Sequence, residues 1–518
     1  MPTYQSPGVY VEEVQSGSRP LEGVGTAIAA FVGLAESGPF NEPTLVSNWT
    51  AFTKAFGGFV AGSYLAQSVY AYFMNGGGNC YVVRIGQNLA AEANGSRNGR
   101  AKEVSAAPTA QIGRLRVDVI EPAATSGSVS VEIADAGGDN PTPDMFKLLV
   151  KRDGEVVEEF DRATLGKGKQ NVVTLVNTVS KLIQVEETAT GSLERPASGE
   201  VALVAPAPPA AIPSGVLSAD DYIGDVAERS GFGGLEAVEE ITMLCVPDLM
   251  SAYQQGAIDL ETVQAVQTSM IAHCELMGDR IAILDPPPGF NAQQIKEWRV
   301  DRARYDSAYA TLYWPWVKTM HPDTGKIAFM PPSGHVAGIW GRNDDTRGVH
   351  KAPANEVVRG AVDIEVNITR TEHDLLNPEG INVIRAFPGQ GIRVWGARTL
   401  SSDPAWRYLN VRRLFNFLEE SILAGTNWVV FEPNDRALWA KIRRTIASFL
   451  VLQWRAGALF GATPDEAFYV KCDDETNPAE AIDAGQVLCE IGVAPVKPAE
   501  FVIFRLAQFS GGTSLVSE

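Results

Sequence analysis

The sequence has few cysteines and no regular cysteine spacing, which argues against a disulfide framework. Its 518 residues include five cysteines, an odd number, and Cys245 and Cys274 stand inside strongly apolar stretches. Apolar surroundings suit buried reduced thiols better than disulfide bridges. We therefore expect a protein that assembles in a cytoplasm. The five positions are Cys80, Cys245, Cys274, Cys472 and Cys489.

Histidines are equally scarce, and their spacing argues against a zinc site. The five histidines never stand three or four residues apart, and none adjoins a paired cysteine, although zinc motifs depend on such spacings. We expect no metal site and no cofactor. The positions are His273, His321, His335, His350 and His373.

Long apolar runs and an excess of positive charge are also missing. The first apolar run, residues 24–34, is far shorter than the roughly 20 residues that span a bilayer, and the opening residues carry no cationic leader. We expect neither a membrane anchor nor a secretion signal. The formal net charge is −19, which argues against nucleic-acid binding, because that function needs cations to replace the counterions of phosphate. An acidic surface would instead keep a self-associating protein soluble.

Motifs for catalysis are weak. Residues 166–169 (Gly-Lys-Gly-Lys) lack the spacing of a phosphate loop, and Gly389-Gln390-Gly391 precedes a strand where a dinucleotide motif would open a helix. Asp248 and Asp285 follow apolar strands, but each adjoins proline, which favours a turn or a cap. Residues 313–316 (Tyr-Trp-Pro-Trp) lie near an apolar run, which favours core or interface over a ligand site. We therefore predict no catalytic residue.

Two other functions stay open at this point. One is a cytosolic α/β enzyme with an inserted β domain, whose site would lie near Asp248, Asp285 and His335. The other is a capsid or baseplate structural protein with exchanged arms. Electron microscopy of the expressed protein separates both from a protein that polymerises into ridged hollow cylinders.

The apolar periodicity predicts an α/β core. Residues 27–34 and 80–85 have the pattern of strands, with a helix between them that ends near Met74. The pattern returns later with a strand at 241–246, a helix at about 260–277 and a strand at 281–285. Strand, helix and strand in this order form right-handed crossover units, so we predict a three-layer α/β core.

A change of composition divides the chain into domains, because 518 residues are too many for one core. From about 88 to 225 the sequence carries short alternating runs such as 115–120 and 129–133, which indicate an inserted, mostly-β domain. We predict an N-terminal arm (1–22), an α/β core (23–90 and 230–384), the inserted β-rich outer domain (91–229), a C-terminal inner α/β domain (385–498), and a C-terminal arm strand with its tail (499–518).

The C-terminal domain is predicted to contain a cationic helix. We expect a strand at 391–398, a helix at 408–423, a strand at 428–431, and a long helix that Asn434 caps and that ends near Arg455. The last helix opposes the charge of the whole chain, so it is either a solvated face with long arginines or a docking face for an acidic partner. Its cations are Arg436, Lys441, Arg443, Arg444 and Arg455.

Both ends of the chain have the pattern of single strands. Residues 9–14 alternate behind a Pro-Gly turn, and residues 501–507 are densely apolar. A single strand must pair with a sheet, in its own subunit or in a neighbour, so these segments are candidate interface arms. Their residues are Val9, Tyr10, Val11, Val14, Phe501, Val502, Ile503, Phe504 and Arg505.

Several segments together resemble the tail sheath proteins of contractile phage tails and contractile injection systems. Residues 4–13 are similar to the amino-terminal arm of that family, and residues 492–505 to its closing strand. Its carboxy-terminal core is matched by 391–400, 406–408, 411–413 and 457–461. The resemblance covers residues 1–90 and 235 to the end, and by analogy the unmatched middle corresponds to the variable outer decoration of the family.

The resemblance implies a structural protein and no enzyme. Sheath subunits of this family form stacked hexameric rings around an inner tube and contract to drive the tube through a target envelope. It implies that residues 7–14 and 500–507 pair with neighbouring copies, and that the cationic helix docks on the tube. The implied partners are other copies of the chain, the inner tube protein, and baseplate and terminator proteins, in a phage tail or a phage-like particle.

Overall fold

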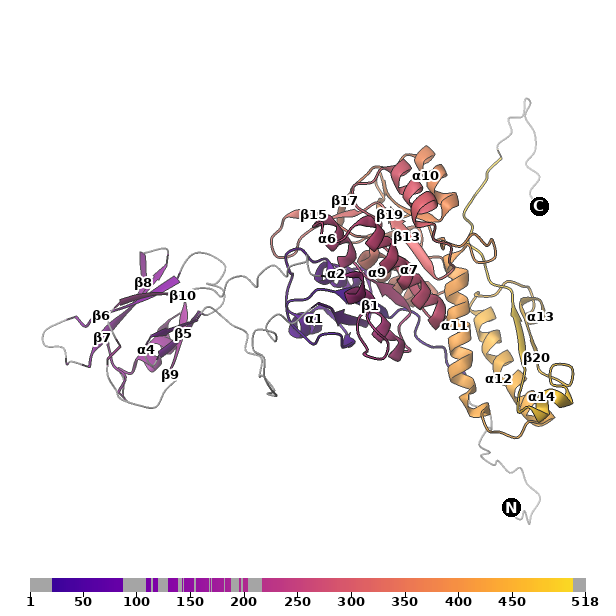
Figure 1. The fold of residues 1–518 in the computed structure, drawn as a ribbon, viewed down its shortest axis with the longest axis horizontal. Coiled ribbons are helices and arrows are strands. Elements are labelled where there is room, and N and C mark those ends of the chain that lie inside the picture. Colours follow the sequence, from indigo (N-terminus) through magenta and orange to yellow (C-terminus); the bar gives the residue numbers. More distant parts are fainter. Residues whose placement is uncertain are drawn as a thin grey trace, which may run out of the picture. The chain divides into compact units, whose positions relative to one another are not determined.

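The computed structural model describes residues 21–86, residues 217–505 and, with short gaps, residues 109–203. The predicted arm residues Val9, Tyr10, Val11 and Val14 lie outside the described residues, as does the end of the predicted C-terminal strand. Two compact units are present, one formed by Met1–Asn88 with Ser214–Glu518 and the other by Leu89–Pro213. The first unit contains a large mixed sheet and a helical hairpin (Figure 1).

Nine strands of the first unit form one mixed sheet in the order β16-β19-β18-β13-β12-β11-β1-β3-β2. The pairs from β18 across to β3 are parallel, whereas β2, β19 and β16 pair in antiparallel fashion at the two edges. The strands are β1 (Ala29–Gly33), β2 (Thr44–Val46), β3 (Cys80–Arg84), β11 (Met243–Cys245), β12 (Ile281–Leu284), β13 (Ala310–Trp314), β16 (Glu356–Val357), β18 (Ile381–Phe387) and β19 (Gly391–Val394).

The central strands are buried along their whole length, which explains their continuous apolar sequences. Every residue of β1, β12 and β13 is buried, as expected for parallel strands that are covered on both faces. The predicted β-α-β units are confirmed: β1 pairs in parallel with β3, and β11 with β12. Because β18 and β19 belong to this sheet, it continues past residue 385.

Small residues allow two helices to cross closely beside the sheet. A Cβ atom at Gly334 of α9 would lie 2.4 Å from the Ser68 carbonyl oxygen of α2, and one at Gly338 would lie 2.3 Å from that of Tyr72. Gly334 and Gly338, which are four residues apart on one face of α9, therefore allow α9 to pack closely against α2. The helices of this part are α1 (Trp49–Phe56), α2 (Leu65–Asn75), α5 (Ala219–Ile223), α6 (Asp248–Gln254), α7 (Leu260–Met277), α8 (Ala292–Glu297), α9 (Ser333–Arg347) and α10 (Arg370–Leu376).

The C-terminal part of the first unit is a helical hairpin with a small sheet beside it (Figure 1). A separate apolar core joins the two long helices, with Leu414 and Leu418 facing Ile442, Ile446 and Phe449. The elements are α11 (Leu409–Thr426), α12 (Arg436–Arg455), α13 (Pro464–Ala467), β20 (Phe468–Lys471), α14 (Ala479–Asp483) and β21 (Glu490–Val493). A further sheet of three strands, β15-β14-β17, is formed by β14 (Val317–Met320), β15 (Ile327–Met330) and β17 (Ala361–Ile364).

Two local predictions for the hairpin were wrong. Residues 428–431 form no strand, because Asn427–Val429 continue from α11 as a 3₁₀ turn and Phe431 has a left-handed backbone with φ of 69°. The cap of α12 is Asp435, whose side chain accepts a hydrogen bond from the Leu438 amide. The neighbouring Asn434 instead accepts a 2.8 Å bond from the Trp439 indole nitrogen.

The described residues of the second unit, Leu89–Pro213, form two small antiparallel sheets and a helix. One sheet has the order β10-β6-β7-β8 and the other β4-β5-β9. Their apolar side chains form a core of their own, which includes Val131, Leu148 and Val185. The elements are β4 (Thr109–Ile112), β5 (Leu115–Val119), β6 (Val129–Asp135), β7 (Phe146–Arg152), β8 (Glu155–Ala163), α4 (Val172–Val179), β9 (Ile183–Glu187) and β10 (Gly199–Leu203).

Candidate assembly interface

Near its C-terminal end, the described part of the chain carries four apolar side chains that face solvent. The exposed fractions are 73% for Phe501, 67% for Val502, 79% for Ile503 and 85% for Phe504, and Arg505 is exposed as well. Residues 501–505 belong to no strand, and they pair with none of the strands that the structure describes. The apolar run predicted from the sequence is therefore largely exposed in the described part of the chain.

A two-stranded sheet beside α12 has free edges. β20 and β21 pair in antiparallel register from Phe468 opposite Val493 to Lys471 opposite Glu490, and no further described strand joins them. A two-stranded sheet has two edges whose backbone groups can accept another strand. The sequence predictions missed this sheet, whose strands are Phe-Tyr-Val-Lys and Glu-Ile-Gly-Val; the β-branched and aromatic residues at 468–470 were the signal that could have revealed it.

The first described residues run along α11 toward the sheet. Leu21 lies against Gly425, where a Cβ atom would come within 1.6 Å of the leucine side chain. The Val24 amide donates a 3.2 Å hydrogen bond to Ser421 Oγ, and the Thr26 carbonyl accepts a 3.0 Å bond from Arg413. The chain therefore enters the described part beside the last turn of α11.

The C-terminal segment leaves the first unit at the opposite end of α11. The Tyr408 hydroxyl, directly before the first residue of the helix, donates a 3.3 Å hydrogen bond to Glu500. In Figure 1 the yellow C-terminal trace continues beyond this end of α11, on the far side from β20. With 18 residues in α11 and a rise of about 1.5 Å per residue, the two points lie roughly 27 Å apart along the helix.

The five cations predicted on α12 differ in their contacts within the chain and in their exposure to solvent. The Lys441 ammonium lies 4.0 Å from the centre of the Trp428 ring, and Arg443 donates a hydrogen bond to the Cys472 carbonyl. Arg436 pairs at 3.0 Å with Asp474, and both side chains are mostly exposed. Arg444 and Arg455 are exposed and, being 11 residues apart, lie on one face of the helix. Fewer cations of this helix are therefore available to a partner protein than its sequence suggests.

The two carboxylates after apolar strands act as caps. Asp248 accepts hydrogen bonds from the Leu34 amide at 2.6 Å, from Ser63 Oγ at 2.9 Å and from the Leu65 amide at 3.1 Å. Asp285 accepts from the amide and the hydroxyl of Ser333 at 2.9 and 2.6 Å, at the first residue of α9. Burial raises the pKa of Asp248 to about 6 and that of Asp285 to about 7, although these hydrogen bonds oppose the shift. Both roles agree with the turn or cap expected from the adjacent prolines.

The remaining candidates for chemistry are buried. His335 is 1% exposed, and neither ring nitrogen has a hydrogen-bond partner. All five cysteines are free thiols, and burial raises the pKa of the Cys80, Cys245 and Cys274 thiols. Tyr313, Trp314 and Trp316 are fully buried core residues.

Two further classes of site were searched for in the described part of the chain. No group of three His, Cys, Asp or Glu side chains there is arranged to hold a metal ion. Among the described helices, none combines the length and the apolar character needed to cross a bilayer.

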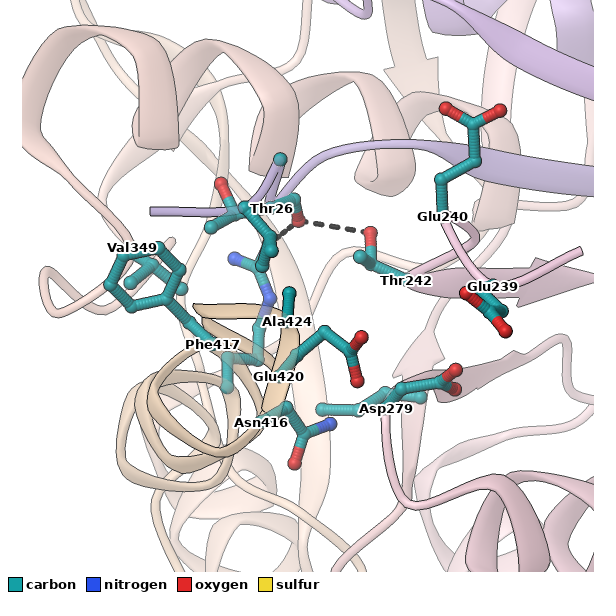
Figure 2. Close-up of a pocket in the computed structure, with 14 residues that line it drawn as sticks. Thr26, Glu239, Glu240, Thr242, Asp279, Val349, Asn416, Phe417, Glu420 and Ala424 are labelled. Atoms are coloured by element: carbon teal, nitrogen blue, oxygen red, sulfur yellow. Dashed lines mark hydrogen bonds between the residues drawn. The ribbon is translucent and has the colours of Figure 1, made fainter. Parts of the chain in front are cut away.

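A cavity of about 250 Å³ lies between α11 and the edge of the core. Figure 2 shows Phe417 and Glu420 of α11 opposite Thr26, Thr242 and Asp279, with Thr242 Oγ1 donating a 2.9 Å hydrogen bond to the Thr26 carbonyl. Burial, and then the negative charges of Asp279 and Glu239, raise the pKa of Glu420.

Two family models match adjacent parts of this chain. The model described as "Phage tail sheath protein central domain" matches residues 215–400, and the one described as "Phage tail sheath C-terminal domain" matches residues 401–509. Together they cover more than half of the 518 residues.

Curated relatives carry the same description. The tail sheath protein of Burkholderia phage BcepMu is 23% identical over 522 residues, which cover 96% of this chain and 95% of that protein. The tail sheath protein of Vibrio phage KVP40 is 26% identical over 243 residues, 44% of this chain and 35% of the relative. The chain thus spans about a third of the KVP40 protein and, similarly, 39% of the tail sheath protein of Salmonella phage ViI.

Solved structures of contractile particles share the fold. The helical sheath of the anti-feeding prophage in its contracted state matches with a TM-score of 0.59 at 24% identity, covering 98% of this chain and 100% of that one. The contracted sheath complex of the extracellular contractile injection system PVC matches with a TM-score of 0.55 at 23% identity, covering 98% and 99%. The chain belongs to the phage tail sheath protein family, which is a structural family and not a family of enzymes.

Proposed function

We propose that this chain is the subunit of a contractile sheath that stacks in helically arranged hexameric rings around an inner tube and shortens to drive the tube through a target envelope. The observation that carries the proposal is the exposed apolar run at residues 501–504, which joins no sheet formed by the described residues. A soluble monomer gains nothing from four such side chains in water. A polymer gains their burial in a neighbouring copy.

The free edges of β20 and β21 are the receiving surface in this proposal. An extended arm that adds a strand to such an edge gains backbone hydrogen bonds as well as side-chain burial. Burying one large apolar side chain contributes roughly 1.5 to 3 kcal/mol, so residues 501–504 would contribute several kcal/mol per contact. The arm strand at residues 9–14 would pair in the same way with a second neighbour.

The positions at which the arms leave α11 support a connected mesh. The N-terminal arm joins the described chain beside Gly425, and the C-terminal arm leaves beside Tyr408. Arms that depart from opposite ends of an 18-residue helix reach toward different neighbours. Each subunit would then be tied to copies on two sides, and the links would persist while the rings move.

The decisive experiment compares the full-length chain with a chain that lacks residues 501–518. Electron microscopy and sedimentation of the expressed wild-type protein should show ridged hollow cylinders, whereas the truncated chain should stay soluble and small. A control chain with Phe501, Val502, Ile503 and Phe504 replaced by serine keeps the length and should also fail to polymerise. Cylinders formed at wild-type yield by either variant would refute the strand exchange.

A second part of the proposal assigns tube docking to α12. Arg444 and Arg455 are exposed cations on one face of this helix, and the chain as a whole is acidic, so this face suits an acidic partner. Exposed ion pairs of about 0 to 1 kcal/mol each would suit a contact that must be released during contraction.

Charge reversal tests the docking face. The variant Arg444→Glu with Arg455→Glu should polymerise but give empty, contracted sheaths when tube protein is co-expressed. Reversal at Lys441 or Arg443 serves as a comparison, because those cations also hold Trp428 and Cys472 in place and should lower stability as well. Normal loading of the Arg444/Arg455 variant on tubes would assign docking to another surface.

The same proposal includes features of the wider particle. Residues 23–90 and 230–384 would form a three-layer α/β sheath core, residues 385–498 the inner domain, and residues 91–229 an inserted outer domain. Partners would be other copies of this chain, the inner tube protein, and baseplate and terminator proteins, with assembly in a cytoplasm and no role for nucleic acid. Contraction would draw on burial between subunits that increases as the sheath shortens, with no nucleotide consumed.

A further inference from the structure

The residue directly before the exposed arm is held firmly by its own subunit. Glu500 accepts hydrogen bonds from Arg398 Nε at 2.8 Å and from Arg398 Nη2 at 2.6 Å, so the ion pair is bidentate. Asn377 Nδ2 donates a third bond at 2.8 Å, and the Tyr408 hydroxyl a fourth at 3.3 Å. Bidentate arginine–carboxylate pairs fix direction as well as distance. Glu500 therefore attaches the start of the arm to its own subunit.

Arg398 is itself fixed to the centre of the large sheet. Its amide donates a 2.8 Å hydrogen bond to Asn382 Oδ1 in β18, and its carbonyl accepts bonds from Asn382 Nδ2 at 2.8 Å and Thr311 Oγ1 at 3.0 Å. Asn382 Nδ2 also donates to Thr311 Oγ1 at 2.8 Å. The Arg398 guanidinium donates a further 3.0 Å bond to the Asn377 carbonyl. Because Thr311, Asn382 and Arg398 are all buried, this network holds Arg398 rigidly.

The change from attached to free chain occurs across one peptide bond. The Glu500 side chain is 20% exposed and the Arg398 side chain 8%, whereas Phe501 is 73% exposed. The sequence predicted an exchanging strand at residues 500–507, and the structure assigns residue 500 to its own subunit. An exchanged strand would then begin at Phe501.

We propose that Arg398 is the positioning residue of the C-terminal arm: through Glu500 it fixes the root of the arm to the central sheet, so that the segment given to the neighbouring copy starts at Phe501. This inference rests on the strand exchange proposed above. Fixing the root shortens the free linker, and a shorter linker raises the effective concentration of the arm at the neighbour's edge. It also passes any pull on the arm into β13 and β18 and away from the helical hairpin.

Acid does not open this attachment in the neutral range. Burial works against ionisation of Glu500, but the hydrogen bonds from Arg398 and Asn377 outweigh it and lower the pKa of this carboxyl below its usual value. Glu500 thus stays charged at the pH values at which such a polymer would assemble and work.

The test replaces Glu500 and a matched glutamate in the full-length chain. Glu419 also pairs with a buried arginine, because both of its carboxylate oxygens accept from Nη2 of Arg412, at 3.1 and 3.0 Å, and it lies on α11 away from the arm. In E500Q, amide hydrogen exchange of residues 494–500 in the soluble chain should rise by about tenfold or more, and the yield of cylinders should fall by a similar factor. E419Q should leave both quantities at the wild-type level.

Mixing separates a positioning role from a general loss of stability. E500Q damages only the arm that a chain gives, so E500Q chains mixed with excess wild-type chains should still enter cylinders through their intact β20–β21 edges. A chain that is merely misfolded would be left out. E500Q with wild-type exchange at 494–500, with a wild-type yield of cylinders, or excluded from mixed cylinders would overturn the inference.

The truncation at residue 501 distinguishes this inference from the function it rests on. If the truncated chain forms normal cylinders, strand exchange itself is refuted. If the truncated chain fails but E500Q assembles normally, the exchange stands and only the role of Arg398 is refuted.

Discussion

Two largely apolar segments of this chain, β13 and residues 501–504, have opposite surroundings. β13 is Ala-Thr-Leu-Tyr-Trp and is buried at every position, between β12 and β18. Residues 501–504 are Phe-Val-Ile-Phe and are exposed at every position. An apolar strand needs cover on both faces, and in this subunit only β13 has it. The difference is that β13 finds its cover within the subunit, whereas the arm has none there.

The comparison explains how one polypeptide can be both a stable globule and a link in a lattice. The buried strand contributes to the folding of the single chain, and the exposed one contributes only after a second copy arrives. Substitutions in the two segments should therefore affect different measurements.

The largest effect is expected in the buried strand. Leu312→Ala in β13 removes a side chain that is fully buried, and deletions of this kind lower the free energy of unfolding by about 2 to 5 kcal/mol. Chemical denaturation of the first unit should show this loss as an earlier midpoint. If Leu312→Ala and wild type unfold at the same denaturant concentration, β13 does not belong to the cooperative core.

The next largest effect is a pH dependence of stability that His335, a buried titrating residue of the core, should cause. The segment 501–504 contains no titrating residue. Burial lowers the pKa of His335 to about 4, from 6.5 when unfolded. Since the folded state favours the neutral ring, stability is complete above pH 6.5 and is lost as the pH falls from 6.5 toward 4, by about 3 kcal/mol at most. The difference in unfolding free energy between wild type and H335L should change with pH in that window. A constant difference between pH 7 and 4 would contradict the buried neutral histidine.

A substitution in the arm should have a smaller effect, and it should change polymerisation and not the unfolding of the soluble chain. Ile503→Ala should leave the unfolding midpoint of the soluble chain unchanged, because the side chain is 79% exposed. It should weaken polymerisation by roughly 1.5 to 3 kcal/mol per contact, the value of one buried aliphatic side chain. The critical concentration for cylinder formation, measured by sedimentation, checks this. A destabilised soluble chain would mean that the arm also packs on its own subunit.

The smallest effect is expected for an exposed ion pair on the helical hairpin. Arg436 and Asp474 pair with side chains that are 81% and 65% exposed, and pairs of this kind are worth about 0 to 1 kcal/mol. Arg436→Ala should therefore shift thermal unfolding very little, and added salt should remove even that shift. A loss as large as that of Leu312→Ala would show that the pair holds α12 against β20.

Local features of the fold could be predicted from the sequence because they depend on neighbours along the chain. The parallel units around β1 and β11, the helix α7 and the buried thiols all follow from apolar periodicity within short segments. Predictions failed where contacts between residues distant in the sequence determined the secondary structure. Residues 428–431 are apolar enough for a strand, yet the turn between α11 and α12 leaves no sheet for them to join.

The candidate interface shows the same division. The sequence indicated the apolar arm and the five cations of α12, but it did not show that Lys441 and Arg443 are already engaged with Trp428 and Cys472. Nor did it show the β20–β21 sheet, whose two strands are separated by a loop containing α14.

The sequence by itself determined which segments must be covered, because apolar side chains in any strand must leave water. Only the tertiary structure decided where that cover comes from. Glu500 and Arg398 lie 102 positions apart, and their contact makes residue 500 part of the globule and residue 501 the start of the arm. Such contacts depend on how the sheet and helices are brought together in space, which no local pattern of residues encodes.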